Sequence, residues 1–260
     1  AAERQRCAED FFYWIDNYGW LHDPHAEDAE LSIIPFMLWP AQRELAAWFI
    51  EGIETGRNRH LNKARSIGAS WLCLHIFMHR FLFHKGFTAK CGSRKEELVD
   101  DRTMDSLFGK LRFIYRRQPG FFKPDKKDFI DNYLLLQNAT MGSEITGEAT
   151  NVGFGRGGRK QAVLFDEFAW VETAIQAQAW TSLETVARCV LDISTPNGKG
   201  NQFHQNCVRS PEQDRRTVNW KANPRRTQEW FDGLLVENGG RLTWDARAQE
   251  HDCNFAGVGG

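Results

Sequence analysis

Apolar residues along the chain fall into runs of two lengths, and the lengths separate strands from helices. Short runs predict strands at 59–62, 87–91, 133–137, 161–165, 190–193 and 216–220. Longer runs predict helices at 7–20, 41–53, 70–83, 93–115, 173–184, 226–236 and 243–250, with Ser93 as an N-cap. Residues 21–35 and 119–127 are expected to connect these elements. Because alternating strands and helices favour a parallel sheet with helices on both faces, the pattern predicts an α/β fold.

One junction between a predicted strand and a predicted helix resembles a phosphate-binding loop. Residues 63–70 read KARSIGAS, whereas the P-loop pattern is G-x-x-x-x-G-K-[ST]. Gly68 and Ser70 match the second glycine and the hydroxyl residue, but Ala69 replaces the lysine and Lys63 replaces the first glycine. Such a loop binds phosphates with backbone N–H groups and a helix N-terminus. The order of strand, loop and helix therefore matches a P-loop, but the lysine stands at the start of the loop rather than before Ser70.

Two cations of this loop could replace the missing lysine. Lys63 has a flexible stem that could fold back over the phosphates, and Arg65 adds a second charge. Ser70 could supply the hydroxyl that holds Mg²⁺. Taken alone, the segment is equally compatible with a basic turn that Gly68 ends before a core helix.

A second segment has the form of a Walker B strand. Residues 161–167 read QAVLFDE, an apolar run that ends in two acids. Asp166 would hold Mg²⁺, directly or through water, and Glu167 would polarise the attacking water as a general base. The alternative is a buried strand followed by a solvated turn. The order of the two motifs along the chain favours the nucleotide site over two unrelated turns.

A third strand ends in hydroxyl residues. The apolar run 190–193 continues into Ser194 and Thr195, and Pro196 and Gly198 then break the strand. Hydroxyls beside a γ-phosphate could sense whether it is present. The residues leave open an ordinary loop start.

Together these segments resemble the ATPase domain of bacteriophage large terminase subunits, the motors that package DNA into procapsids. Three further segments add to the resemblance, which spans residues 35–255: they are 138–146, which reads NATMGSEIT, 154–159, which reads FGRGGR, and 248–255, which reads AQEHDCNF. The resemblance implies a RecA-like (ASCE) P-loop NTPase fold with a central, mainly parallel sheet. It implies ATP and Mg²⁺ as cofactors.

The resemblance also implies roles for individual residues. Lys63 should contact the β/γ-phosphates with help from Arg65, Ser70 and Asp166 should hold Mg²⁺, and Glu167 should activate water. Arg156, or else Arg159, should act as an arginine finger on a neighbouring subunit. Gln42 resembles the family's adenine-reading glutamine. The residues expected to bind nucleotide are Gln42, Lys63, Arg65, Ser66, Gly68, Ala69, Ser70, Ser194 and Thr195.

The expected partners and domains follow from the same resemblance. They are double-stranded DNA, further copies of the chain in a ring, a portal protein and the small terminase subunit, in the host cytoplasm. Residues 1–54 should form a helical segment on the adenine side, 55–222 the ATPase core, and 223–260 a helical lid with the start of a linker. The family's nuclease domain would follow, so no nuclease activity is expected from this chain.

Composition limits the other readings. The 260 residues carry a net charge of −1, which indicates no general affinity for nucleic acid, so a DNA motor would depend on a local basic patch. Candidate patches are Arg112, Arg116 and Arg117; Lys123, Lys126 and Lys127; and Arg225 with Arg226. The six scattered cysteines indicate neither zinc nor a disulfide framework, and no signal peptide or membrane span is expected.

Two other functions remain compatible with the motifs. A superfamily 2 helicase-like ATPase would need a second RecA-like domain, for which 260 residues leave no room. A non-catalytic nucleotide-binding module is favoured by Ala69 in the lysine position and disfavoured by the presence of Glu167.

Overall fold

The computed structural model describes residues 1–23, 32–151, 153–155 and 158–256. The chain divides into two compact units. Unit 1 is Ala1–Leu38 with Ser70–Ala149, and unit 2 is Trp39–Ala69 with Thr150–Gly260. The three-part division expected from the sequence stays a prediction.

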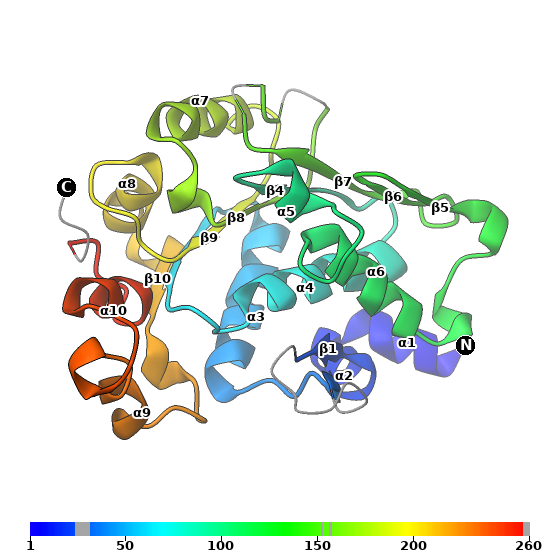
Figure 1. Cartoon of the computed structure of the whole chain (residues 1–260). Coiled ribbons are helices and arrows are strands. Elements are labelled where there is room, and N and C mark those ends of the chain that lie inside the picture. The colour runs from blue at the N-terminus through cyan, green and yellow to red at the C-terminus, as the bar shows by residue number, and fades with distance from the viewer. Residues whose placement is uncertain (24–31, 152, 156–157, 257–260) are drawn as a thin grey trace. The chain divides into compact units, whose positions relative to one another are not determined.

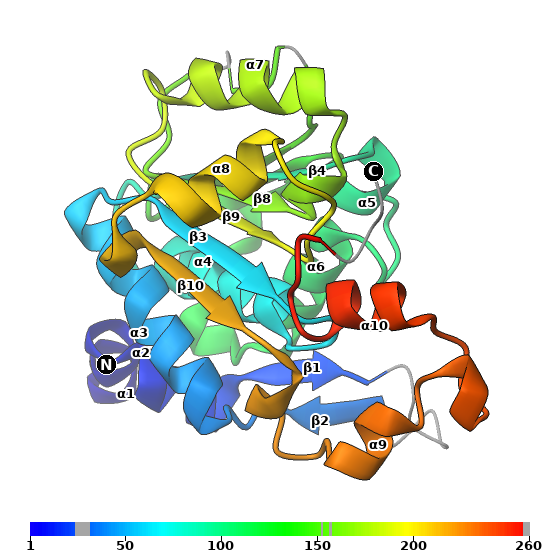
Figure 2. The same cartoon turned by 90° about the vertical axis from the view of Figure 1, so that its left-hand side faces the viewer.

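Unit 2 contains four parallel strands in the order β10-β3-β9-β8. Their bounds are β3 Arg59–Lys63, β8 Ala162–Asp166, β9 Val190–Ser194 and β10 Arg215–Val218. The order is not the chain order, so the strands are joined by crossovers that contain helices (Figure 2). The crossover helices of unit 2 are α7 Thr173–Leu183 and α8 Gln202–Arg209. α3 Pro40–Thr55 precedes β3, and α9 Gln228–Asp232 and α10 Trp244–Glu250 follow the last strand.

The side chains of β3 alternate between two helical layers of unit 2. Arg59 Nε donates to the carbonyl oxygen of Trp48 in α3, 2.8 Å away. The ring of the next residue, His60, lies 5.6 Å from the ring of Trp180 in α7. Since successive side chains of a strand point to opposite faces, α3 covers one face of these strands and α7 the other. Unit 2 therefore has helices on both faces, as the sequence predicted.

Unit 1 contains the strands β4 Thr88–Ser93, β5 Phe129–Asn132, β6 Leu135–Asn138 and β7 Ser143–Ala149, in the order β4-β7-β6-β5. β4 and β7 are parallel, whereas β5, β6 and β7 are antiparallel neighbours. The helices α4 Ala69–Phe83 and α6 Leu107–Arg117 lie on the same side of these strands (Figure 1). The remaining elements are α1 Ala2–Glu9, α2 Phe11–Tyr18, α5 Glu96–Val99 and the antiparallel pair β1 Trp20–His22 and β2 Ile33–Pro35.

The helix α4 forms the core of unit 1. Its sequence is apolar on all sides, and most of its side chains are fully buried. A helix of this composition needs cover all round. The N-terminal helices supply part of it, because His79 Nε2–H donates to the carbonyl oxygen of Cys7 and Trp14 packs on the rings of His75 and His79.

Four predictions of single elements were wrong. The connector expected at 21–35 contains most of β1 and all of β2. The helix expected at 7–20 is two helices, because Asp10 is extended and its carboxylate caps α2 by accepting from two backbone N–H groups. The helix expected at 93–115 is α5 and α6, and Ser93 is the last residue of β4 rather than an N-cap. The strand expected at 133–137 begins only at Leu135, since Leu134 has a φ of +55° in the turn that joins β5 to β6.

Among the described residues, no helix combines the length and the apolar character needed to cross a membrane.

Candidate nucleotide site

The carboxyl ends of the parallel strands of unit 2 collect the polar residues that the sequence singled out. β3 ends at Lys63, β8 at Asp166 and β9 at Ser194. Parallel strands present their carboxyl ends at one edge, and α/β proteins bind ligands there. The structure thus brings together, at this carboxyl edge of unit 2, three segments that are far apart in the chain.

The loop after β3 turns twice through the left-handed region. Ser66 has a φ of +61° and Gly68 a φ of +78°, and Ile67 between them is buried. Glycine adopts this conformation without steric cost, which explains Gly68. Backbone turned in this way can aim N–H groups at an anion, and α4 begins directly after the loop at Ala69. Ser70 is the second residue of that helix.

The two cations of the loop differ in their partners. Arg65 is exposed, and its Nε and Nη2 donate to the two carboxylate oxygens of Glu250 at 2.7 and 3.2 Å. The backbone N–H of Arg65 also donates to the carbonyl oxygen of Glu250, at 2.8 Å. Lys63 is half-buried, and its ammonium makes no hydrogen bond or ion pair with any residue that the structure describes. Lys63 is therefore the cation that is available to a ligand.

The two acids differ in backbone conformation. Asp166 ends β8 in regular extended backbone, whereas Glu167 has a φ of +56°. A left-handed non-glycine residue is strained and is typical of functional sites. The hydrogen bonds to Glu250 raise the pKa of the Arg65 guanidinium, and the nearby charge of Glu167 adds to that rise. Glu167 thus lies close enough to the loop to act electrostatically on it.

The hydroxyls at the end of β9 hold the turn that follows Glu167. Ser194 Oγ accepts from the backbone N–H of Ala169 at 3.2 Å, and Thr195 Oγ1 accepts from Trp170 Nε1 at 3.0 Å. Both residues are buried. Ser194 pairs with Asn62 and Asp166 with Ile193, so the Ser194 and Asp166 side chains lie on opposite faces of the sheet. These hydrogen bonds link the end of β9 to the turn after Glu167, and the sensing of a γ-phosphate by Ser194 and Thr195 stays a prediction.

A segment at the end of the described chain ties the strand ends together. Gln249 Nε2 donates to the carbonyl oxygen of Pro196 at 2.7 Å, and Asn62 Nδ2 donates to that of Cys253 at 2.9 Å. Glu250, between them, holds Arg65. The sequence analysis included residues 248–255 in the family resemblance but predicted no role for any of them. It did not identify Asn62 as a residue of the site. Only the long-range contacts reveal them.

Gln42 lies next to the loop and is buried. Its Nε2 donates to the carbonyl oxygen of Ile67 at 2.9 Å, and its Oε1 accepts from the backbone N–H of Trp39 at 3.0 Å. The amide therefore braces the loop against the start of α3. Its contact with adenine stays a prediction, which the second N–H and the second lone pair of the amide still allow.

The ligands expected for Mg²⁺ have the right chemistry for a hard cation. Asp166, at the end of β8 in unit 2, carries a carboxylate, an oxygen ligand that Mg²⁺ takes together with water and substrate phosphates. Ser70, the first residue of the second segment of unit 1, carries a hydroxyl, and its share in such a site stays a prediction. The finger candidate Arg156 lies outside the described residues. Arg159 is exposed in the Gly-rich segment before β8, next to Gly158 with a φ of +82°.

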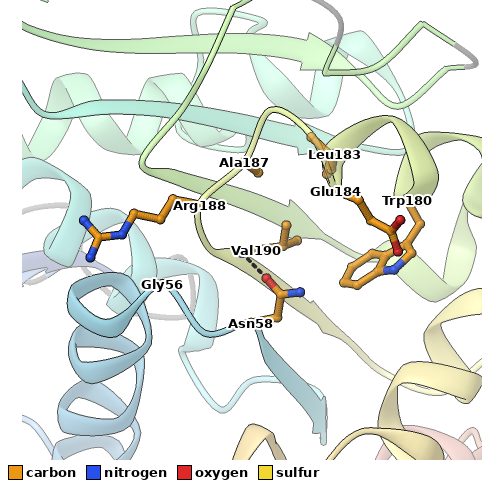
Figure 3. Close-up of a pocket in the computed structure, with 8 residues that line it drawn as sticks. All are labelled: Gly56, Asn58, Trp180, Leu183, Glu184, Ala187, Arg188 and Val190. Carbon is orange, nitrogen blue, oxygen red and sulfur yellow. Dashed lines mark hydrogen bonds between the residues drawn. The ribbon is translucent and has the colours of Figure 1, made fainter.

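The opposite, amino edge of the same strands holds a hollow of about 240 Å³ (Figure 3). Asn58 Oδ1, just before β3, accepts from the backbone N–H of Val190 at 2.9 Å. Arg188 Nη2 donates to the carbonyl oxygen of Glu54 at 2.6 Å, and Figure 3 shows this side chain directed away from Trp180. The polar side chains that line this hollow therefore hydrogen-bond to the protein's own backbone where strands and helices meet.

A family model for the N-terminal region of terminase large subunits, T4likevirus-type, matches residues 60–260. A search of curated proteins finds no match.

Solved structures of phage terminases share the fold. The large terminase ATPase domain of Thermus phage P74-26 is 15% identical with a TM-score of 0.62, over 95% of this chain and 98% of that one. The large terminase of bacteriophage HK97 is 14% identical with a TM-score of 0.58, over 94% of this chain and 50% of that one. The large terminase of a thermophilic bacteriophage, solved with ADP, is 11% identical with a TM-score of 0.55, over 84% and 54%.

Proposed function

The chain belongs to the family of terminase large subunits, and we propose that it hydrolyses ATP as the motor domain that drives double-stranded DNA into a procapsid. The observation that carries the proposal is the carboxyl edge of unit 2. There Lys63, which has no hydrogen bond or ion pair with any described residue, and the loop with two left-handed residues follow β3. The acids Asp166 and Glu167 follow β8, on the other side of β9. This set supplies the charge, the N–H groups and the base that phosphoryl transfer to water requires.

Each residue would have a distinct task in the reaction. Lys63 would neutralise the charge that develops on the β- and γ-phosphates, and the N–H groups of residues 66–70 would orient them. Glu167 would accept a hydrogen bond from the attacking water and align it with the γ-phosphorus. Asp166 and Ser70 would hold Mg²⁺, which supplies further charge neutralisation when it is bound. Positioning and charge account for most of the catalysis in such sites.

ATP as the nucleotide is supported by a relative. The large terminase of the thermophilic bacteriophage has been solved with ADP and with ATP-gamma-S. The phosphate-binding elements here are those that a triphosphate needs. To move DNA, copies of the chain would form a ring on the portal protein in the host cytoplasm. The small terminase subunit would be a further partner.

A neighbouring copy would complete the site. Arg156 or Arg159 would reach the γ-phosphate of the adjacent subunit and stabilise the transition state, a contribution worth about 10³–10⁵ in rate in other NTPases. Exposure of Arg159 is consistent with that role. Specific activity should then rise with protein concentration.

The test compares wild type with Glu167→Gln, which keeps the shape and removes the base. Phosphate release should fall by about 10² or more in the variant, while the affinity for a fluorescent ATP analogue stays within about threefold. Hydrolysis is measured over a range of protein concentrations, so that dependence on a neighbour is visible. Equal rates for the two proteins would contradict the role of Glu167. Binding of the analogue without hydrolysis by wild type at every concentration would instead indicate a non-catalytic nucleotide module.

A further inference from the structure

Unit 1 contains a strongly basic hollow of about 510 Å³ between α6 and the loop 100–106 that precedes it. Four arginines line it: Arg102, Arg112, Arg116 and Arg117. The apolar part of the lining includes Met104 and Phe113. For a chain with a net charge of −1, this is a local concentration of positive charge.

Two of the four arginines already have carboxylate partners. Arg112 is buried, donates to both oxygens of Asp100 at 2.7 and 2.9 Å, and donates to Asp131 at 2.6 Å. Arg102 is half-exposed and lies 3.6 Å from Asp131. Arg112 therefore belongs to the wall of the hollow, and the expectation that it forms part of a solvent-facing patch is wrong. Asp100 and Asp131 balance the charges of Arg112 and Arg102, so the surplus positive charge of the lining is that of the other two arginines. Asp101 and Asp105 of the same loop are exposed and are not among the residues that line the hollow.

Arg116 and Arg117 are exposed and carry the surplus. Neither guanidinium has a hydrogen bond or ion pair with another described residue. The Arg117 guanidinium lies 4.9 Å from the ring of Phe113 and 5.5 Å from that of Trp20. Contact with ring faces fixes the plane of a guanidinium and leaves its edge, with the N–H donors, free. That edge matches two oxygens of one phosphate.

The fold holds the loop firmly against the helix. A Cβ at Gly109 would lie 1.5 Å from the carbonyl oxygen of Thr103, so only glycine permits the approach of the loop to α6. Ser106 Oγ caps the helix by accepting from the N–H of Gly109. Arg102 has a φ of +68°, a strained conformation that places its side chain at the hollow. The hollow is thus a fixed feature of unit 1.

We infer that this hollow binds the phosphodiester backbone of double-stranded DNA, with Arg116 and Arg117 on the phosphates. The inference rests on the proposed function, since it names where unit 1 would contact the DNA that the motor moves. Backbone contacts carry no sequence preference, which suits a motor that must move any sequence. The site is separate from the residues that would hydrolyse ATP.

The test measures binding of a fluorescein-labelled DNA duplex by anisotropy over a series of salt concentrations. Arg116→Ala/Arg117→Ala should bind at least tenfold more weakly, and the slope of log K against log salt should fall by about 2. The charge-matched control is Lys85→Ala/Arg209→Ala, which removes two exposed cations elsewhere and should change affinity by less than about twofold. Arg116→Lys/Arg117→Lys keeps the charge and the fold but loses the planar edge, so it should keep the slope and bind about three- to tenfold more weakly.

Several outcomes separate this inference from the proposed function. Equal affinity and slope for wild type and the alanine pair would overturn the inference. So would equal losses in the alanine pair and in the control, because these would indicate a general charge effect. Failure of wild type to bind the duplex overturns it as well. ATP hydrolysis without DNA is measured in parallel, and it should be unchanged in all of these variants; its absence in wild type would instead contradict the ATPase itself.

Discussion

The two edges of the parallel strands in unit 2 use charged residues in opposite ways. At the amino edge, Arg57 and Arg59 share Asp214, with three nitrogen–oxygen distances between 2.7 and 2.9 Å. At the carboxyl edge, Lys63 has no hydrogen bond or ion pair among the described residues, and Glu167 is held in a strained conformation. The first edge satisfies its charges internally. The second pairs Arg65 with Glu250 but leaves the charge of Lys63 and the strain of Glu167 available to a ligand.

This difference explains why a hollow alone is a poor guide to the site. The hollow at the amino edge is lined by groups such as Asn58 and Arg188 that bond to the protein's own backbone. The carboxyl edge also has a buried acceptor without a partner among the described residues, Asn62 Oδ1. Unsatisfied polar groups are rare in folded proteins, and they mark places where a further partner is expected.

The largest effect should come from Lys63, the loop cation without a hydrogen bond or ion pair among the described residues. Lys63→Ala should reduce ATP hydrolysis by about a thousandfold, because a preorganised positive charge on the phosphates is lost. Arg65→Ala should cost much less, about tenfold, because Arg65 is held by Glu250 rather than by the ligand. The steady-state rate of phosphate release measures both. If the two variants lose equally, the assignment of the displaced cation to Lys63 is wrong.

The next effect concerns stability at the amino edge. Asp214→Asn should lower the free energy of unfolding by about 3 kcal/mol, because it leaves the buried guanidinium of Arg59 without its main partner. Urea unfolding measures the change. ATP hydrolysis per folded molecule should remain within about twofold of wild type. A large loss of hydrolysis at full stability would show that the amino edge also takes part in the reaction.

The carboxyl edge should be the more sensitive to acid. His251 follows Glu250 at this edge, and its carbonyl oxygen accepts from the backbone N–H of Trp220, just after β10. Burial lowers the pKa of His251 to about 4, and the charge of Arg226 adds to this. Below pH 6.5 the unfolded chain therefore binds a proton that the folded chain does not, so this residue lowers stability as pH falls from about 6.5 to about 4. The loss should be about 1.4 kcal/mol per pH unit.

Urea unfolding at about pH 7 and about pH 5 tests this, with His251→Gln expected to reduce the slope by that amount. Asp214→Asn is the control from the other edge. The hydrogen bond from Arg57 lowers the pKa of Asp214 below 3.8, so its stabilisation is lost only as pH falls through that lower range. An unchanged slope in His251→Gln would contradict the assignment of acid sensitivity to the carboxyl edge.

The smallest effect compares two glycines, one at each edge. Gly68 and Gly56 have φ values of +78° and +75°, so alanine at either should lower stability by about 1 kcal/mol. Only Gly68→Ala should also slow ATP hydrolysis, by roughly tenfold, because it changes the loop that we propose orients the phosphates. Thermal unfolding followed by circular dichroism measures the stability, and phosphate release measures the rate of hydrolysis. Equal hydrolysis in both variants would indicate that the loop tolerates a Cβ.

Secondary structure near the site was predictable because its causes are local. The strand before Lys63, the helix after Gly68 and the apolar strand before Asp166 follow from runs of apolar residues and from the conformational freedom of glycine. The break at Asp10 and the turn at Leu134 were missed, because a side-chain cap and a positive φ at a non-glycine residue leave almost no mark on the apolar pattern.

By itself, the sequence determined the α/β class, the loop with a displaced cation and the pair Asp166 and Glu167. It left open whether Lys63 or Arg65 faces the phosphates, and it counted Arg112 among candidate surface cations. The tertiary structure pairs Arg65 with Glu250, 185 positions along the chain, and Arg112 with Asp131, 19 positions away. Arg112 is therefore no surface cation, and the pairing of Arg65 favours Lys63 in the proposed contact with the phosphates. A charge is available to a ligand only when folding brings no carboxylate to it, and that depends on contacts that local pattern does not record.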